Sequence, residues 1–247
     1  MKNAIVDPTV HLHTQVVSAH GQQYGENVHY VPVVAEELRQ LIVEYPCCLL
    51  KNNQTGQFGL HALLGFTPGE NLFLSGEQWC ANAIPMHIQR QPFMVGRVGE
   101  RNEMTNQQKS LLTIDMNSNR VKDSSYNKGD GKRLFDDKGT PTDYLKTMNQ
   151  LVTTLAQGII RTESFIKALV EHDLIEAIQV GVTFTGGEKH KFDGLYVINE
   201  ANLSSLDEAI LVEFHRNGYL QACHLLSASM SNLQKLIVLK NELLSAN

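Results

Sequence analysis

The sequence lacks the features that would place a chain in a membrane or on a nucleic acid. It contains no uninterrupted apolar run of about 18 residues, the length typical of a transmembrane helix. Its first residues hold no apolar stretch of signal-peptide length. With 21 Lys and Arg against 26 Asp and Glu, the formal net charge is −5, whereas nucleic acids and anionic membranes bind basic surfaces. We therefore expect a cytoplasmic protein that has neither a nucleic acid nor a membrane as its partner.

Cysteine is scarce, and its spacing fits neither a disulfide framework nor a zinc site. The four cysteines are Cys47, Cys48, Cys80 and Cys223. None of them forms a CxxC pair, so buried and reduced thiols are the favoured interpretation. His11 and His13 could place two imidazoles on one strand face, but no acidic or cysteine ligand lies at a motif spacing from them. We therefore expect no metal site.

Recognisable catalytic motifs are absent as well. The sequence contains neither GxSxG nor HExxH, and no order of serine, histidine and aspartate suggests a triad. The Gly129–Lys132 segment resembles a phosphate-binding loop only faintly, because the GxxxxGK[ST] spacing is missing and no strand precedes it. We therefore expect no cofactor, and the sequence assigns no catalytic residue.

What the sequence does contain is a mixture of helical and strand periodicities. Apolar residues at helical spacing predict an amphipathic helix over 36–45 and a long helix over 142–171, which ends at His172 and Asp173. Alternation at every second residue predicts a hairpin from strands at 178–184 and 192–198. Further strands are expected at 47–51, 57–66, 71–74, 93–98, 110–116 and 219–226, and helices at 206–217 and after Ser229. The fold class is α+β, with a mixed, largely antiparallel sheet packed against one long helix and two C-terminal helices.

The whole chain, 1–247, is predicted to be a single domain. Its length allows a large core without help from metals or disulfides. The segment 117–143 differs from the rest because it is charged, contains glycine and is poor in aliphatic residues. Unstructured segments of this length are uncommon inside a domain, so we expect a surface excursion there.

The stretch from Glu70 to Val95 holds the only tryptophan and most of the polar candidates for a ligand site. Arg90 could donate two hydrogen bonds to a carboxylate or phosphate; alternatively, it forms a structural salt bridge with Glu70 or Glu77. Trp79 could line a pocket or simply anchor the core.

A second candidate lies near the C-terminus. His224 is followed by Ser227 and Ser229, so it could act as a base beside a hydroxyl group. The alternative is a histidine at the edge of the core and a serine that caps the last helix. The ligand-binding residues that the sequence predicts are Glu70, Asn71, Trp79, Arg90 and His224.

Several segments, in order along nearly the whole chain, resemble the SapC family, a bacterial family named after a surface-layer gene region. They are Val31 to Val34, Glu36 to Pro46, Leu64 to Phe66, Asn71 to Phe73, Trp79 with Ile84 and Pro85, Arg90 to Phe93, Leu134 to Asp136 with Gly139 and Pro141, Gly194 to Tyr196, and Ser229 to Leu236. The resemblance implies a bacterial protein of about this length. It implies no mechanism and carries over no catalytic residue.

Three classes of function follow from these observations. The favoured class is a non-enzymatic cytoplasmic binding or accessory protein, with a peptide, a protein or a small molecule held between the sheet and the long helix. The first alternative is a cofactor-independent enzyme that acts on a small acidic substrate through Arg90 and a carboxylate, or through His224. The second is a structural protein associated with a surface layer. Assembly into a homo-oligomer remains open in each class.

Overall fold

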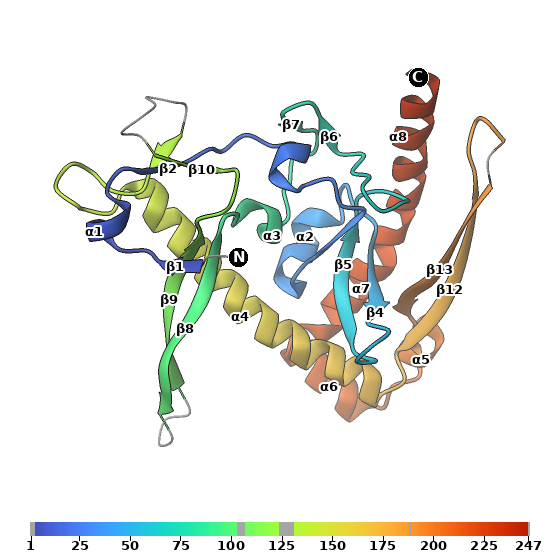
Figure 1. Ribbon diagram of the computed structural model, residues 1–247. Helices are drawn as coiled ribbons and strands as arrows, with labels where there is room; N and C mark the ends of the chain where they lie inside the picture. The colour runs from blue at the N-terminus through green and yellow to red at the C-terminus, as the bar shows by residue number, and fades with distance from the viewer. Residues whose placement is uncertain (1–2, 103–106, 124–130, 188, 247) are drawn as a thin grey trace. The chain divides into compact units, whose positions relative to one another are not determined.

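The computed structural model describes residues 3–102, 107–123, 131–187 and 189–246. By its internal contacts the chain divides into two compact units. Unit 1 comprises residues 1–26, 76–78 and 86–157, and unit 2 comprises residues 27–75, 79–85 and 158–247. Each unit combines antiparallel sheets with helices, as the α+β prediction requires (Figure 1).

Unit 1 contains two three-stranded antiparallel sheets, ordered β1-β9-β8 and β10-β2-β11. Its elements are β1 (Asn3–Ile5), α1 (Pro8–His11), β2 (Thr14–Val16), η1 (Gln22–Tyr24), α3 (Met86–Gln89), β8 (Phe93–Asn102), β9 (Gln107–Asp115), β10 (Val121–Asp123), β11 (Lys132–Arg133) and the first half of α4 (Asp143–Glu171). Strands β10 and β11 come from the expected excursion at 117–143, and both pair with β2. Residues 124–130 of that excursion, with Gly129, lie outside the described residues.

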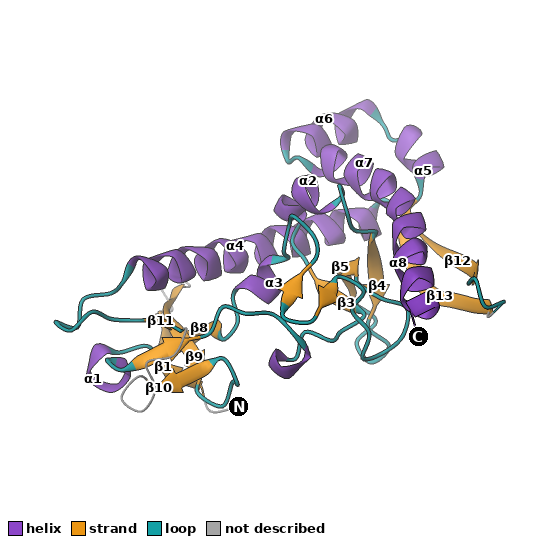
Figure 2. Ribbon diagram, turned by 90° about the horizontal axis from the view of Figure 1, so that it is seen from above, coloured by secondary structure: helices purple, strands orange, loops and turns teal. Residues whose placement is uncertain are grey.

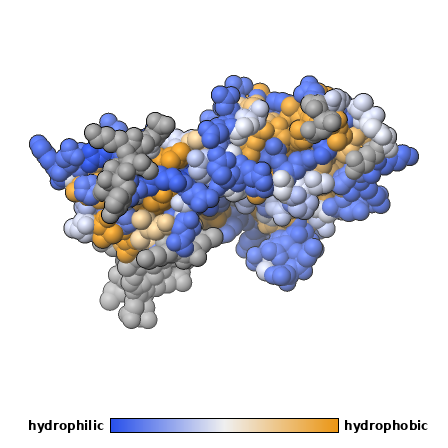
Figure 3. All heavy atoms as spheres, turned by 45° about the horizontal axis from the view of Figure 1, so that its top comes forward, coloured by the Kyte–Doolittle hydropathy of each residue, from blue (hydrophilic) through white to orange (hydrophobic). Residues whose placement is uncertain are grey.

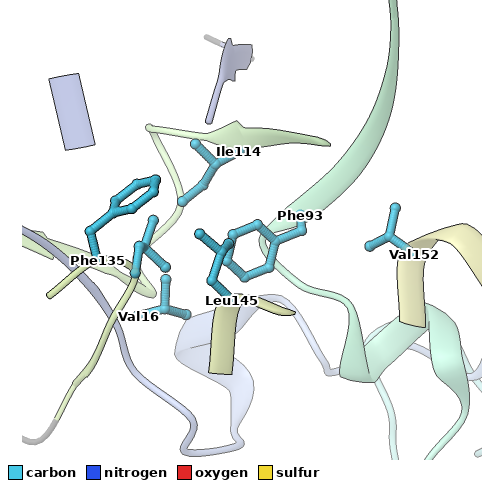
Figure 4. Close-up of a cluster of buried hydrophobic side chains, with 7 residues drawn as sticks. Val16, Phe93, Ile114, Phe135, Leu145 and Val152 are labelled. Carbon is cyan, nitrogen blue, oxygen red and sulfur yellow. The ribbon is translucent and has the colours of Figure 1, made fainter. Parts of the chain in front are cut away.

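The core of unit 1 joins its sheets to the first half of α4. Phe93 of β8 and Ile114 of β9 are fully buried, and Val152 of α4 lies in the same cluster. Figure 4 shows the Phe93 ring among the side chains of this cluster, with Leu145 beside it. Burial of side chains of this kind contributes about 1.5–3 kcal/mol each.

Unit 2 is built on a five-stranded antiparallel sheet with the order β12-β13-β4-β5-β3. Its elements are β3 (Tyr30–Pro32), η2 (Ala35–Glu37), α2 (Leu38–Leu41), β4 (Cys47–Lys51), β5 (Phe58–Leu63), β12 (Ile175–Thr183), β13 (Lys189–Ile198), α5 (Glu200–Ser204), α6 (Glu208–Arg216), α7 (Tyr219–Ser229), η3 (Met230–Asn232), α8 (Leu233–Ala246) and the second half of α4. The two short strands β6 (Leu74–Ser75) and β7 (Gln78–Trp79) form a two-stranded sheet of their own. Figure 2 shows the helices of this unit gathered around its strands.

The long helix α4 begins and ends as its sequence predicts. The Thr142 hydroxyl accepts the Leu145 N–H at the first turn. At the other end Asp173 has a positive φ of 52°, and the Leu174 N–H returns to the Leu169 carbonyl. This bond is typical of a Schellman motif. Gly158 does not interrupt the helix; it lets the backbone approach Val34, whose Cγ2 would lie 3.0 Å from an added Cβ.

Four of the expected elements differ from the structure. The helix expected over 36–45 is the 3₁₀ turn η2 followed by the four-residue helix α2. The segment 219–226 is helical, as part of α7, rather than a strand. Of the strand expected at 71–74, only Leu74 lies in β6. Ser229 does not cap the last helix, because its side chain bonds to β4 and to α7 instead.

The described helices include none that is both long and apolar enough to cross a membrane. Apolar atoms form patches on the face drawn in Figure 3, and polar side chains separate them. Among the exposed apolar residues of unit 2 are Val238, Leu243 and Leu244 of α8.

Ser229 supplies a buried hydrogen bond that we expect to be needed for the stability of unit 2. Its hydroxyl accepts the Cys47 N–H at 3.0 Å and lies 2.7 Å from the Leu226 carbonyl oxygen. In Ser229→Ala the Cys47 N–H would stay buried without its acceptor, so the free energy of unfolding should fall by about 1–3 kcal/mol. Urea denaturation measures this loss.

The matched control is Ser231→Ala, because Ser231 is exposed and bonds only within its own turn. Its effect should stay within about 0.5 kcal/mol. Equal effects of the two substitutions would show that the bond to Cys47 does not stabilise the unit.

Candidate functional site

Unit 2 has a partly open cavity of about 170 Å³ between its sheet and α8. Leu50 of β4, Leu63 of β5 and Leu195 of β13 line it from the sheet, and Leu233 and Leu236 line it from α8. Leu50 lies directly opposite Leu195 in the antiparallel register, so their side chains share one sheet face. The cavity therefore lies against α8, whereas the sequence had led us to expect a pocket beside the long helix.

Aromatic rings complete the wall of this cavity. His29, Tyr30, Phe66 and Phe192 all line it. Phe66 packs on Phe192 with the ring centroids 4.9 Å apart. Rings and leucines together give the cavity the apolar character that is usual for small-molecule sites.

A second cavity, of about 310 Å³, adjoins the first. Tyr30 and Leu50 line both cavities, and His61 lines only the second. Tyr30 contacts His29 and His61 edge to face, at centroid distances of 4.5 and 5.2 Å. A row of three rings thus runs along the sheet face from one cavity to the other.

The orientation of His61 fixes its tautomer. Its Nδ1 lies 2.9 Å from the Gly59 carbonyl oxygen, which can only accept, so Nδ1 carries the proton. The Nε2 atom is then an acceptor, and no described residue bonds to it. Burial lowers the pKa of His61, so its imidazole is neutral at neutral pH. Burial also lowers the pKa of His29, against the opposing effect of the Glu70 carboxylate.

Glu70 holds two walls of the first cavity in place. Its Oε2 accepts the Phe66 N–H at 2.6 Å, and its Oε1 accepts a hydrogen bond from Lys240 Nζ of α8 at 2.5 Å. Gly65, between the strand end and Phe66, is packed so closely that an added Cβ would lie 2.8 Å from the Glu70 carbonyl oxygen. The sequence predicts Glu70 as a ligand contact; the structure shows it binding other parts of the protein that line the cavity.

Two other predicted residues, Asn71 and Trp79, take part in local structure. The Asn71 Oδ1 accepts the Phe73 N–H at 3.0 Å, as in an Asx turn. The Trp79 Nε1 donates to the Tyr45 hydroxyl at 2.8 Å, and that hydroxyl donates to the Ala83 carbonyl at 2.6 Å. Tyr45 is fully buried, and its burial raises the pKa of its phenol. Trp79 is therefore tied to the core, the alternative that the sequence left open.

Arg90 and His224 complete the predicted set. Arg90 belongs to unit 1, where its guanidinium donates to the Phe93 carbonyl at 2.9 Å and lies 3.5 Å from His87 Nδ1. Burial lowers the pKa of Arg90. His224 is an exposed residue of α7 in unit 2. Neither residue is among those that line the two cavities described above.

Sequence reasoning missed the cavity residues Tyr30, His61, Phe66 and Phe192. A signal was present, because Gly59, His61 and Leu63 alternate along β5 and so share a sheet face. Two small or polar positions beside an apolar one on the less buried face of a strand indicate space next to that face. Among the residues that the structure describes, no cluster of His, Cys, Asp or Glu is large enough to hold a metal ion.

The bonds of Glu70 predict a loss of stability when its carboxylate is removed. Glu70→Ala would leave the Phe66 N–H and the Lys240 ammonium without their acceptor. The free energy of unfolding should fall by about 1–3 kcal/mol. The control is Glu242→Ala, an exposed carboxylate on the same helix as Lys240. If both substitutions have the same small effect, Glu70 does not hold the cavity walls.

The lowered pKa values of His29 and His61 predict a pH dependence of stability. Because protons bind the unfolded chain more tightly, the stability that these neutral side chains contribute is complete above the ordinary pKa of 6.5 and falls as the pH drops below it. We expect the denaturation midpoint to decrease from pH 7.5 to 5, and to decrease less in His61→Gln. A His61→Gln profile that is parallel to the wild-type one would contradict this assignment.

Comparison with known proteins gives one match. The chain matches no curated protein and no solved structure. The SapC family profile matches residues 6–236. That span covers both cavities of unit 2 and nearly the whole chain, and it agrees with the segments that carried the resemblance. The chain belongs to the SapC family.

Proposed function

We propose that the chain is a non-enzymatic binding or accessory protein of the cytoplasm, and that it holds a small metabolite or part of a peptide in the paired cavities of unit 2. The observation that carries the proposal is the first cavity, which is lined by five leucines and four aromatic rings. A largely apolar cavity beside a few fixed polar groups is the usual form of a small-molecule site. The thiols of Cys47, Cys48 and Cys223 are free and buried, which fits a reducing compartment.

Unit 1 also has a cavity, of about 340 Å³, but it is a weaker candidate. Ile5, Leu112, Phe135 and Leu145 are among its lining residues. Its lysine, Lys146, is already paired with Asp143 at 2.9 Å. The cavity therefore offers little that would fix the orientation of a ligand, whereas the unit 2 cavities have His61 at a fixed position.

The test is a titration with two neutral probes, toluene and N-acetyl-phenylalaninamide, followed by amide chemical shifts. We expect saturable shifts at β4, β5 and β13, since these strands line the cavity, and none at β8 of unit 1. Leu233→Trp should fill the cavity from α8 and abolish both responses. Leu50→Phe is a second filling variant, in case Leu233→Trp does not fold.

Two results would contradict the proposal. The first is that neither probe shifts the sheet at millimolar concentration. The second is that binding is unchanged in both filling variants. Hydrolysis of N-acetyl-phenylalaninamide during the titration would instead favour the alternative of a cofactor-independent enzyme.

A further inference from the structure

The size of the first cavity limits the apolar part of its ligand. The cavity measures about 170 Å³ and is lined mainly by leucine and aromatic side chains. An engineered protein cavity of about 150 Å³ with similar walls stays dry and binds benzene. A group the size of a benzene ring therefore matches the volume of this cavity.

The charged residues at the two cavities already have their own partners. Asp193, which lines the first cavity, accepts a hydrogen bond from Gln179 at 2.6 Å and lies 3.9 Å from Lys191 Nζ. Lys51, which lines the second cavity, places its ammonium over the Phe58 ring, 5.3 Å from the centroid. Since both charged groups are exposed and have partners within the chain, neither is a buried counter-charge for a charged ligand, and the arrangement favours an uncharged one.

Several polar atoms of the second cavity are engaged within the turn that borders it. Asn52 Oδ1 accepts the N–H groups of Gln54 and Thr55, and Thr55 Oγ1 accepts the Gln57 N–H. These bonds close the turn between β4 and β5. His61 Nε2 is left as an acceptor, because the Gly59 carbonyl fixes the other ring nitrogen as the donor.

We propose that the paired cavities bind an uncharged molecule that carries a benzene-sized apolar group and, beside it, a hydrogen-bond donor that His61 Nε2 accepts. The apolar group occupies the first cavity, and the donor extends past Tyr30 and Leu50 into the second. An alcohol or an amide N–H next to a phenyl or branched aliphatic group has this chemistry. The inference rests on the proposed function, because it specifies the ligand of the same site.

The test compares four probes with a phenyl ring and different polar groups: toluene, 2-phenylethanol, the methyl ether of 2-phenylethanol, and phenylacetate. The dissociation constant of each is measured by the chemical-shift titration described above, at pH 7.5. We expect 2-phenylethanol to bind about tenfold more tightly than its ether, because the ether has no donor for His61. Phenylacetate should bind more weakly than the alcohol.

Substitutions at His61 test whether this residue causes the difference in affinity between the alcohol and its ether. In His61→Leu the alcohol should lose its advantage over the ether, while toluene binding persists. In His61→Gln, where an amide oxygen can still accept, part of the advantage should remain.

The outcomes separate this inference from the proposed function. If toluene binds but the alcohol and the ether bind equally, the role of His61 is wrong and the apolar site stands. The same conclusion follows if His61→Leu keeps the advantage of the alcohol. If no probe binds, both the proposed function and this inference are wrong.

Discussion

The candidate site of unit 2 depends on one carboxylate. Glu70 accepts a hydrogen bond from Phe66, four residues away, and one from Lys240, 170 residues away in the chain. Phe66 and the helix of Lys240 form two walls of the same cavity. Charge-assisted bonds of this kind are stronger than neutral ones, and a partly buried carboxylate is costly to leave with one partner missing. The space between sheet and helix is therefore held open by an ion pair at its edge rather than by packing alone.

The polar groups at the two cavities of unit 2 can act on a ligand through hydrogen bonds of fixed direction rather than through net charge. The two histidines that face the cavities are kept neutral by burial, and the nearby ionised groups of Asp193 and Lys51 are directed at Gln179 and the Phe58 ring. A site of this kind selects a ligand by where its donors lie, because an unmatched hydrogen bond in an apolar surrounding costs more than a mismatch in water. It gives little electrostatic attraction at long range.

The spacing of apolar residues correctly predicted the elements whose own sequence has a strong apolar pattern. Helix α4 and the β12–β13 hairpin follow from strong apolar patterns, and both are confirmed. Helix α7 was expected to be a strand because Ala222, Cys223 and Ser229 supply its buried face, and such small residues make a weak apolar stripe. Near the site, Glu70 was chosen as a candidate ligand contact from its place on a turn, and the structure shows it bonded to Phe66 and Lys240. Lys240 was not predicted as its partner, since no short-range pattern encodes a contact between such distant residues.

The two glycines of the cavity wall show why the remaining part of the site was hidden. An added Cβ at Gly65 would lie 2.8 Å from a backbone oxygen of Glu70, and one at Gly59 would lie 2.8 Å from the His61 ring. Neither glycine has the positive φ that marks a turn residue, so in the sequence both read as ordinary strand positions. The lack of a side chain at both positions leaves space for a neighbouring group. The first lets Glu70 approach the end of the strand, and the second lets the His61 ring lie along its own strand with Nδ1 on the Gly59 carbonyl. The position of the His61 Nε2 acceptor thus depends on residue 59 being a glycine.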